Sequence, residues 1–343
     1  MKLPEQLFYL CGMGARRKFL FRDGILFDAC SGEQLRQWEA RDIEVAPHEY
    51  SCSWRTSKNI SCSLREDQNG VWLQENDEQT CLSTDHVALP RFEDHPHTAL
   101  LRALHADILV NIVNTGPLPN LLVYDKPWYR DAALVAMCLQ KTGNLHLIEA
   151  WINSLREPFD CLNKGHREPD NLGQLLYMIS LVGDASHPLV ATILNEVESF
   201  KRDDYIIGVS DYAEHPVYQT KWLKFGLRAL GLPDPYRIPA VFDSYSALFW
   251  MDFKNQHVAS PGFSCDEGDS YPYLAWAQAH FHHSPPPLHL LGTTYPLTWE
   301  SAASQANYNG MKIIAPAYLE RRIAAPHTWH AAEAFLYLWE LDK

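Results

Sequence analysis

Two carboxylate side chains lie three positions apart in the segment DYAEHPVYQT (211–220), just ahead of a stretch with helical periodicity. Hydrolysis of a glycosidic bond uses a pair of carboxyl groups, one as acid and one as base. Glu214 is therefore the first candidate for the general acid, and Asp211 is the second. The structural alternative is that this segment is simply a solvated loop.

The base of an inverting hydrolase stands roughly 6.5–9.5 Å from the acid, so it would come from a distant part of the chain. Glu320 in AYLERRIAAP meets this requirement of sequence distance. Glu300 in PLTWESAAS is its rival. Both could equally be acids at the start of a helix, where the helix dipole favours negative charge.

Aromatic and forked polar side chains stand together in KPWYRDAAL (126–134). A sugar ring needs a flat apolar surface for stacking and rigid donors and acceptors for its hydroxyl groups. We predict that Trp128 stacks on the ring and that Arg130 and Asp131 bind its hydroxyl groups. Alternatively, Asp131 caps a helix and Arg130 pairs with a neighbouring acid.

Three further polar segments precede or begin predicted helices: HREPDNLGQLLY, CDEGDSYPYLAWAQAHF and APHTWHAAEAF. The first contains four polar groups in five residues, more than helix capping needs. The second clusters like charges, which costs free energy unless they meet water, a cation or a hydroxyl-rich ligand. From these segments we predict as substrate-binding residues Arg167, Asp170, Glu267, Asp269, Tyr271, Trp329 and His330.

The run HFHH (280–283) could place two histidines on one helical face, but no zinc-motif spacing surrounds it. Histidine is also favoured at the C-terminus of a helix. The nucleotide-binding patterns G-x-x-x-x-G-K-[ST] and G-x-G-x-x-G and the hydrolase pattern G-x-S-x-G are absent from the sequence. We therefore expect neither a metal nor a cofactor.

The elements that would position these residues change in kind along the chain. Short β-type runs broken by turns occur at 17–21, 25–29, 50–54, 59–64 and 71–74. From residue 97 onward apolar residues recur three and four apart, which predicts helices. They cover 98–113, 131–143, 145–155, 171–183, 187–200, 217–231, 239–253, 270–281, 298–308 and 328–341. We expect a β-rich region at 1–95 and a helical domain at 96–343.

These motifs resemble those of the six-hairpin glycosidase superfamily, and especially its glucoamylase-like hydrolases. Trp128, Arg130 and Asp131 match the Trp-x-Arg-Asp segment with which that family binds the sugar at the cleavage subsite. The stretches RE-PDNLG, EGDSYPY and APHTWHAAE resemble its Arg-Pro-x-x-Asp-Gly, Tyr-Pro-Glu-Asp-x-Tyr and Leu-Thr-Trp-Ser-His-Ala segments. DYAEHPVYQT takes the place of the family's acid-bearing Trp-Glu-Glu stretch, and Glu320 takes the place of its base.

The resemblance spans about residues 119–341. It implies a mainly α fold, an α/α toroid like a whole or incomplete six-hairpin barrel, behind a small N-terminal antiparallel β region. It also implies a glycoside hydrolase that acts on an oligosaccharide by paired-carboxylate catalysis. Two alternatives stay open. One is a polysaccharide lyase or sugar isomerase, for which Tyr212, His215 and His330 would matter more, and the other is a non-catalytic carbohydrate-binding or regulatory protein.

Composition narrows the class of partner. The net charge is −13, and no Lys/Arg-rich run is present, so nucleic acid is a poor candidate partner. Eight cysteines are scattered singly, which predicts reduced thiols. No secretion signal is recognisable, and no apolar run approaches the roughly 20 residues that span a bilayer. We expect a soluble cytoplasmic protein with a carbohydrate substrate, and the sequence favours no oligomeric state.

Overall fold

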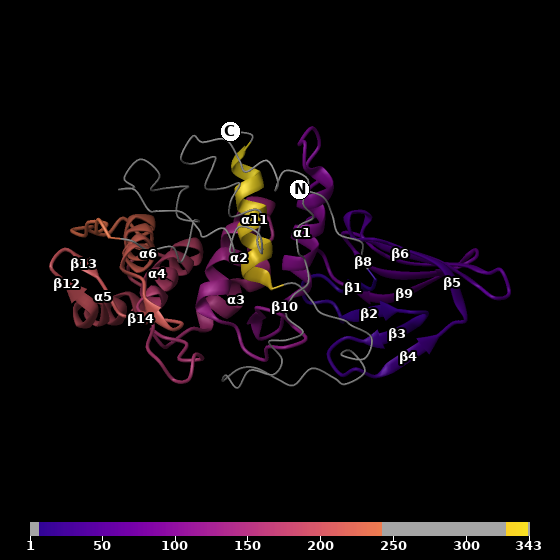
Figure 1. Cartoon of the computed structure of the whole chain (residues 1–343), viewed down its shortest axis with the longest axis horizontal. Helices are drawn as coiled ribbons and strands as arrows, with labels where there is room; N and C mark the ends of the chain where they lie inside the picture. The colour runs from indigo at the N-terminus through magenta and orange to yellow at the C-terminus, as the bar shows by residue number, and fades with distance from the viewer. Residues whose placement is uncertain (1–6, 242–326, 342–343) are drawn as a thin grey trace. The chain divides into compact units, whose positions relative to one another are not determined.

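The computed structural model describes residues 7–241 and 327–341 (Figure 1). The chain divides into two compact units. Among the described residues, the β-containing unit comprises 7–127, 137–147 and 327–341, and the helical unit comprises 128–136 and 148–241. The division passes through two helices, so α2 (Tyr129–Thr142) and α3 (His146–Ser154) contribute to both units.

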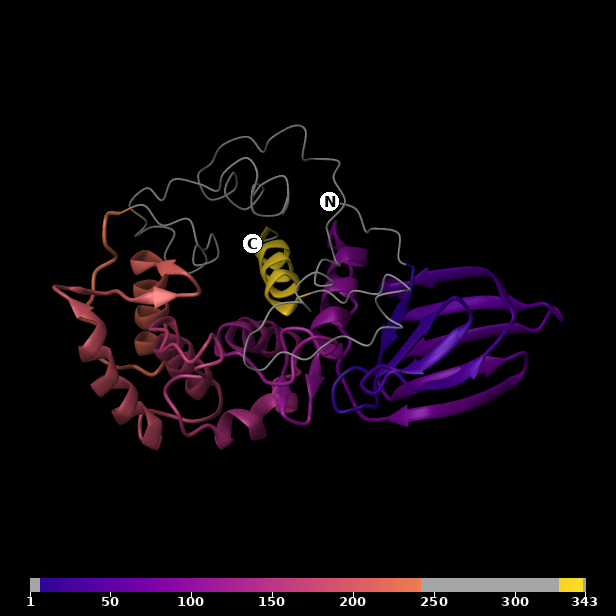
Figure 2. The same cartoon turned by 60° about the horizontal axis from the view of Figure 1, so that its bottom comes forward.

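The β-containing unit holds two larger antiparallel sheets (Figure 2), and the strands of each follow one another in chain order. The first consists of β1 (Tyr9–Cys11), β2 (Phe19–Arg22), β3 (Ile25–Asp28) and β4 (Gln34–Gln37). The second consists of β5 (Ala40–Ala46), β6 (Ser51–Thr56), β7 (Ser61–Glu66), β8 (Gly70–Glu75) and β9 (Glu78–Thr84). These strands confirm the β-type runs predicted from the sequence.

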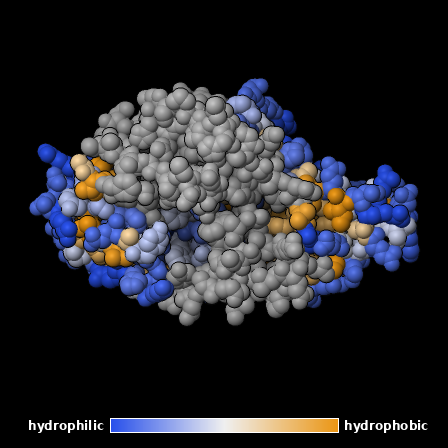
Figure 3. All heavy atoms as spheres, in the orientation of Figure 1, coloured by the Kyte–Doolittle hydropathy of each residue, from blue (hydrophilic) through white to orange (hydrophobic). Residues whose placement is uncertain are grey.

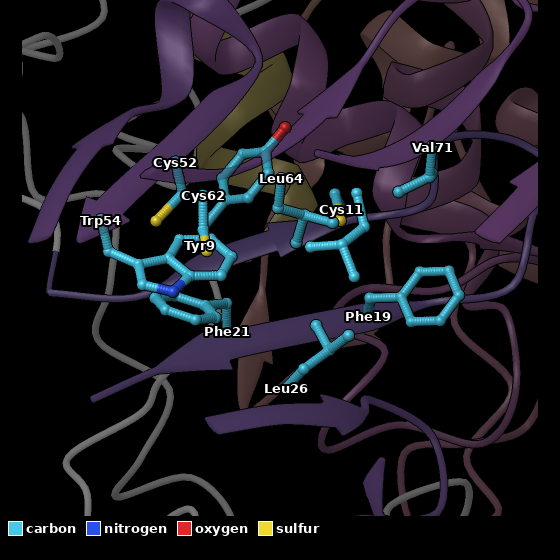
Figure 4. Close-up of a cluster of buried hydrophobic side chains, with 11 residues drawn as sticks. Tyr9, Cys11, Phe19, Phe21, Leu26, Cys52, Trp54, Cys62, Leu64 and Val71 are labelled. Atoms are coloured by element: carbon cyan, nitrogen blue, oxygen red, sulfur yellow. The ribbon is translucent and has the colours of Figure 1, made fainter. Parts of the chain in front are cut away.

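Side chains from both sheets meet in one hydrophobic core (Figure 4). Trp54 of β6 stacks on Phe21 of β2, with ring centroids 4.3 Å apart. Cys52 lies in this core as a free thiol, and burial raises its pKa to about 12. A thiol that stays protonated packs as a small apolar side chain. The outer strand β5 is largely exposed, and hydrophilic residues cover the end of the sheets near it (Figure 3).

Two helices that are distant in the sequence complete the β-containing unit. The helices α1 (Thr98–Val110) and α11 (Thr328–Leu341) pack against each other. The ring of Phe92 lies edge-on to Phe335 of α11 and to His105 of α1, at centroid distances of 5.8 and 6.0 Å. Shorter elements of this unit are the 3-10 turn η1 (Pro47–Glu49) and the paired strands β10 (Ile112–Val113) and β11 (Gly116–Pro117).

The helical unit adds three helices and two small hairpins. Its helices are α4 (Asp170–Val182), α5 (Pro188–Phe200) and α6 (Pro216–Ala229). Its hairpins are β12 (Lys201–Arg202) with β13 (Tyr205–Ile206), and β14 (Val209–Ser210) with β15 (Ala213–Glu214). The backbones of α4 and α6 approach closely at Gly173 and Gly226, because a Cβ on Gly173 would lie 2.2 Å from the carbonyl carbon of Trp222.

The expected mainly α fold is wrong, and so is the α/α toroid that the family resemblance implied. The described residues form antiparallel sheets of four and five strands beside seven α-helices, a mixed architecture of sheets and helices. Helices are confirmed within the predicted segments 98–113, 131–143, 145–155, 171–183, 187–200, 217–231 and 328–341, although the first ends at Val110 and residues 112–113 form β10. Periodicity shows that a segment buries one face, but not which element covers that face. The toroid therefore did not follow from the helices.

Some predictions fall outside these observations. The helices predicted at 270–281 and 298–308 lie outside the described residues, and so does the helix predicted at 239–253 from residue 242 onward. The domain boundary at 95/96 stays a prediction. None of the helices that the structure describes is long and apolar enough to cross a membrane.

Candidate functional site

Arg130 is a buried arginine, 3% exposed, that contacts three carboxylate groups within the helical unit. Its Nε donates to Asp170 at 2.9 Å, its Nη2 lies 3.2 Å from Glu168, and its Nη1 lies 2.7 Å from Asp211. The three partners come from the start of α4, the loop before it and the turn of the β14–β15 hairpin. Charges in a protein interior need such partners, because the low dielectric penalises an uncompensated ion.

The first turn of α2 fixes the position of Arg130. The backbone N–H of Tyr129 donates to the carboxylate of Asp160 at 2.8 Å, which satisfies one of the free donors at this helix start. The backbone N–H of Asp160 in turn donates to the side chain of Asn171 at 3.2 Å. The start of α2 is therefore tied to the start of α4. Burial raises the pKa of Asp160, which its hydrogen bonds oppose.

Asp170 is the first residue of α4 and does not cap the helix. Pro169 precedes the helix, and no side chain caps the N-terminus of α4. Besides Arg130, the carboxylate of Asp170 accepts hydrogen bonds from Gln174 at 2.9 Å and from the hydroxyl group of Ser210. Asp170 thus joins α2, α4 and the β14–β15 hairpin in one buried network.

Helix α6 holds the same hairpin from the other side of this network. Nε2 of Gln219 donates to the hydroxyl oxygen of Ser210 at 2.9 Å and to the carbonyl of Gly208 at 2.7 Å. The backbone N–H of Gly208 donates back to Gln219 at 3.1 Å. On α6, the hydroxyl oxygen of Tyr218 accepts from Gln174 at 3.2 Å. A glutamine with both ends engaged restrains the strand that leads to Asp211.

Asp211 occupies the turn of the hairpin with a φ angle of 58°, in the left-handed region that non-glycine residues rarely adopt. Its carboxylate contacts Arg130, yet its side chain is 28% exposed. The next residue, Tyr212, is 84% exposed, and Glu214 on β15 is exposed as well. The hairpin therefore brings a carboxylate of the buried network to the surface, beside an exposed aromatic ring and a second carboxyl group.

Glu168 is the residue of this site that sequence reasoning did not select. Its side chain is 1% exposed, and burial raises its pKa to about 7, with Asp170 adding to the rise and Arg130 opposing it. Glu168 stands between Arg167 and Asp170, both of which were selected. No pattern in the sequence distinguishes a buried glutamate from an exposed one in this loop, so only its neighbours could have drawn attention to it.

The predicted binding residues near Arg130 divide into two groups. Trp128 and Asp131 are buried, at 8% and 3% exposure, so Trp128 does not present a ring face to solvent. Arg167 is a surface residue whose guanidinium pairs with Glu196 of α5 and stacks on the ring of Phe159, 4.5 Å from its centroid. Arg167 therefore takes no part in the contacts around Arg130 that the structure describes.

The remaining predicted residues lie elsewhere. Trp329 and His330 belong to the first turn of α11 in the β-containing unit, where burial lowers the pKa of His330 to about 3. Their rings stack with centroids 6.3 Å apart. Outside the described residues are Glu267, Asp269, Tyr271, Glu320 and Glu300.

Among the described residues, no group of three His, Cys, Asp or Glu side chains could hold a metal ion. The run HFHH falls outside them. In comparisons with known proteins, no family model, curated protein or solved structure matches the chain. The assignment to the six-hairpin glycosidases was therefore wrong: the described fold contradicts it and no comparison supports it.

Proposed function

We propose that the helical unit carries a carbohydrate site that hydrolyses a glycosidic bond, with Asp211 as a reacting carboxylate. One observation carries this proposal: a buried arginine holds Asp211 at 2.7 Å while part of the same carboxylate stays open to solvent. Reacting groups need to be both positioned and accessible, and a residue held in a strained turn by its surroundings is often a functional one.

The hairpin offers the other parts that hydrolysis would use. The exposed ring of Tyr212 provides a flat apolar surface on which a sugar ring can stack. In this proposal Asp211 activates the attacking water and Glu214 protonates the leaving oxygen. A ring bound against Tyr212 would also shield Glu214 from water, which favours proton donation. Glu320 stays a candidate for the base on sequence grounds alone.

The charges around Arg130 favour a neutral oligosaccharide over a uronic acid. Arg130 is shared among three carboxylates, Glu168, Asp170 and Asp211, so these four groups carry more negative than positive charge when ionised. A polysaccharide lyase has to stabilise the carboxylate of its substrate. Arg130 is already neutralised by its own partners, which makes the lyase alternative less well supported than the hydrolase.

The test is an assay for new reducing ends and for ultraviolet absorbance on a panel of neutral and uronic-acid oligosaccharides, with Asp211→Asn compared with the wild type. Asparagine tolerates the left-handed conformation, so this substitution removes the charge and keeps the turn. Asp203→Asn is a matched control, because Asp203 is an exposed aspartate with a φ angle of 54° in the neighbouring β12–β13 turn.

We expect Asp211→Asn to lower kcat by a factor of about 100 or more and Asp203→Asn to leave it unchanged. Equal activity in Asp211→Asn and the wild type would refute the role of Asp211. Products that absorb in the ultraviolet would indicate a lyase instead. Binding of an oligosaccharide with no turnover would indicate a carbohydrate-binding protein.

A further inference from the structure

We infer that Glu168 is a positioning residue for Asp211, and that its ionised carboxylate keeps the turn of the β14–β15 hairpin in its left-handed conformation. The inference deepens the proposed function and, for its consequence on catalysis, rests on it. The hold that Glu168 exerts on the turn is a property of the protein alone, so it can be measured without any substrate.

The backbone N–H, the carbonyl and the carboxylate of Asp211 each contact a residue of the buried network. Its backbone N–H donates to Oε1 of Glu168, and its carbonyl accepts from Nδ2 of Asn163 at 2.8 Å. Its carboxylate contacts Arg130 at 2.7 Å. A non-glycine residue stays at a positive φ only where its surroundings over-determine the conformation. Asn163 and Arg130, which contact the carbonyl and the carboxylate of Asp211, also contact Glu168.

Glu168 accepts two hydrogen bonds and forms one ion pair in these contacts. Its Oε1 accepts from the backbone of Asp211 and from Nδ2 of Asn163 at 3.1 Å, and its Oε2 pairs with Arg130 at 3.2 Å. An ionised carboxylate accepts only and carries a negative charge, so it suits both N–H donors and the guanidinium of Arg130. A protonated carboxyl group brings a hydrogen of its own into the same space, and one of the three contacts has to weaken.

The charged groups around Glu168 set the pH at which this happens. Arg130 of α2 favours its ionised form, and Asp170 of α4 disfavours it, while hydrogen bonds from the Asp211 turn and from Asn163 of the preceding loop favour it. Burial outweighs the favourable contacts and raises the pKa of Glu168 to about 7. The hydrogen bond from Asp211 favours the ionised form, so opening the turn while Glu168 stays buried removes that bond and raises the pKa of Glu168 further. By this linkage the ionised carboxylate stabilises the closed turn above about pH 7, and the hold weakens as the pH falls below 7.

Hydrogen exchange at residues 209–214 of the full chain tests this hold. After correction for intrinsic rates, we expect wild-type exchange at this hairpin to be about tenfold faster near pH 6 than near pH 8. Glu168→Gln should exchange fast at both pH values, because an amide has no charge to pair with Arg130 and its own NH2 group is a donor among donors. Glu196→Gln, which removes a glutamate from the surface pair with Arg167, should behave as the wild type.

Protection in Glu168→Gln equal to that of the wild type at both pH values would overturn the inference. If Glu168→Gln does not fold, the wild-type protein alone tests the inference, because protection at residues 209–214 that does not change with pH would also overturn it. Where hydrolysis is found, Glu168→Gln should lower kcat more than it changes KM and should abolish an acid limb near pH 7. Absence of hydrolysis in every protein refutes the proposed function and leaves the exchange result standing.

Discussion

At the scale of single residues, burial decides what an arginine contributes. Arg130 is 3% exposed and compensates Glu168 and Asp170, which are themselves buried. Removing one partner of a buried ion cluster leaves uncompensated charge, which typically costs about 3–5 kcal/mol. We expect Arg130→Met to lower the free energy of unfolding by about that amount, measured by urea denaturation followed by circular dichroism.

Arg167→Met is the matched control for this prediction. Arg167 also pairs with a glutamate and stacks on a ring, but its side chain is 49% exposed. Exposed ion pairs contribute about 0–1 kcal/mol. Comparable losses in Arg130→Met and Arg167→Met would contradict the view that the carboxylates around Arg130 depend on it.

The same pair of residues shows what the sequence could reveal. Arg130, Asp170 and Asp211 were selected from their types and from the helices that follow them, and the structure brings them into contact. Arg167 was selected on equal grounds and lies at the surface, while its neighbour Glu168 lies at 1% exposure. Adjacent residues in a loop can point into the protein or out of it, and no period in the sequence encodes that choice.

At the scale of elements, α4 and α6 depend on two glycines. A Cβ on Gly173 would lie 2.2–2.4 Å from the backbone atoms of Trp222 and Leu223, which a rotamer change cannot relieve. Alanine favours helix by about 1 kcal/mol over glycine, but overpacking against backbone costs more. We expect Gly173→Ala to destabilise the protein by at least about 2 kcal/mol, measured by thermal or urea unfolding.

The glycine that directly follows α4 provides the comparison. Gly183 follows the last residue of α4, its φ angle is −156°, and an added Cβ would meet only the carbonyl oxygen of Ile179 at 3.7 Å. Gly183→Ala should therefore change the free energy of unfolding by less than about 1 kcal/mol. If both substitutions prove equally mild, the close approach of α4 and α6 is not required for stability.

A helix or strand can be predicted from the sequence to the extent that its apolar residues recur with a regular period. Helix α4 was predicted at 171–183 and spans Asp170–Val182, because its apolar residues recur over more than three turns. Strands β14 and β15 have two residues each, too few for alternation to register, so the sequence gives no sign of a hairpin around Asp211. The hairpin nevertheless sets the direction of Asp211. The shortest elements were thus the ones that position the candidate site.

At the scale of the whole molecule, short motifs did not specify the architecture. Trp128, Arg130 and Asp131 stand at a helix start in this protein, as their spacing suggested, but all three are buried and the described fold is not a toroid. An aromatic residue followed by Arg-Asp at the start of a helix satisfies packing and ion pairing in any fold that buries them. The β-type runs, by contrast, predict strands of the N-terminal region, but they do not show that these strands form two sheets around one core.

The two units share α2, and this continuity predicts how the molecule unfolds. Ala136 and Met137 are neighbours in the middle of α2 and belong to different units, so neither unit can lose that helix without affecting the other. Trp54 is distant from α2 in the sequence and lies in the hydrophobic core of the two sheets, where it is 2% exposed. Replacing a core tryptophan with alanine costs about 3–5 kcal/mol. In a cooperative molecule that loss is felt throughout.

We therefore expect Trp54→Ala to lower protection against hydrogen exchange in α4 and α6 as much as in strands β1–β9, under conditions where exchange reports global unfolding. Ser53→Ala, at an exposed position on the same strand, should change neither. Unchanged protection of α4 and α6 in Trp54→Ala would mean that the units unfold separately. In that case the site around Arg130 would depend for its stability on the helical unit alone, and a break within α2 would have to separate the two.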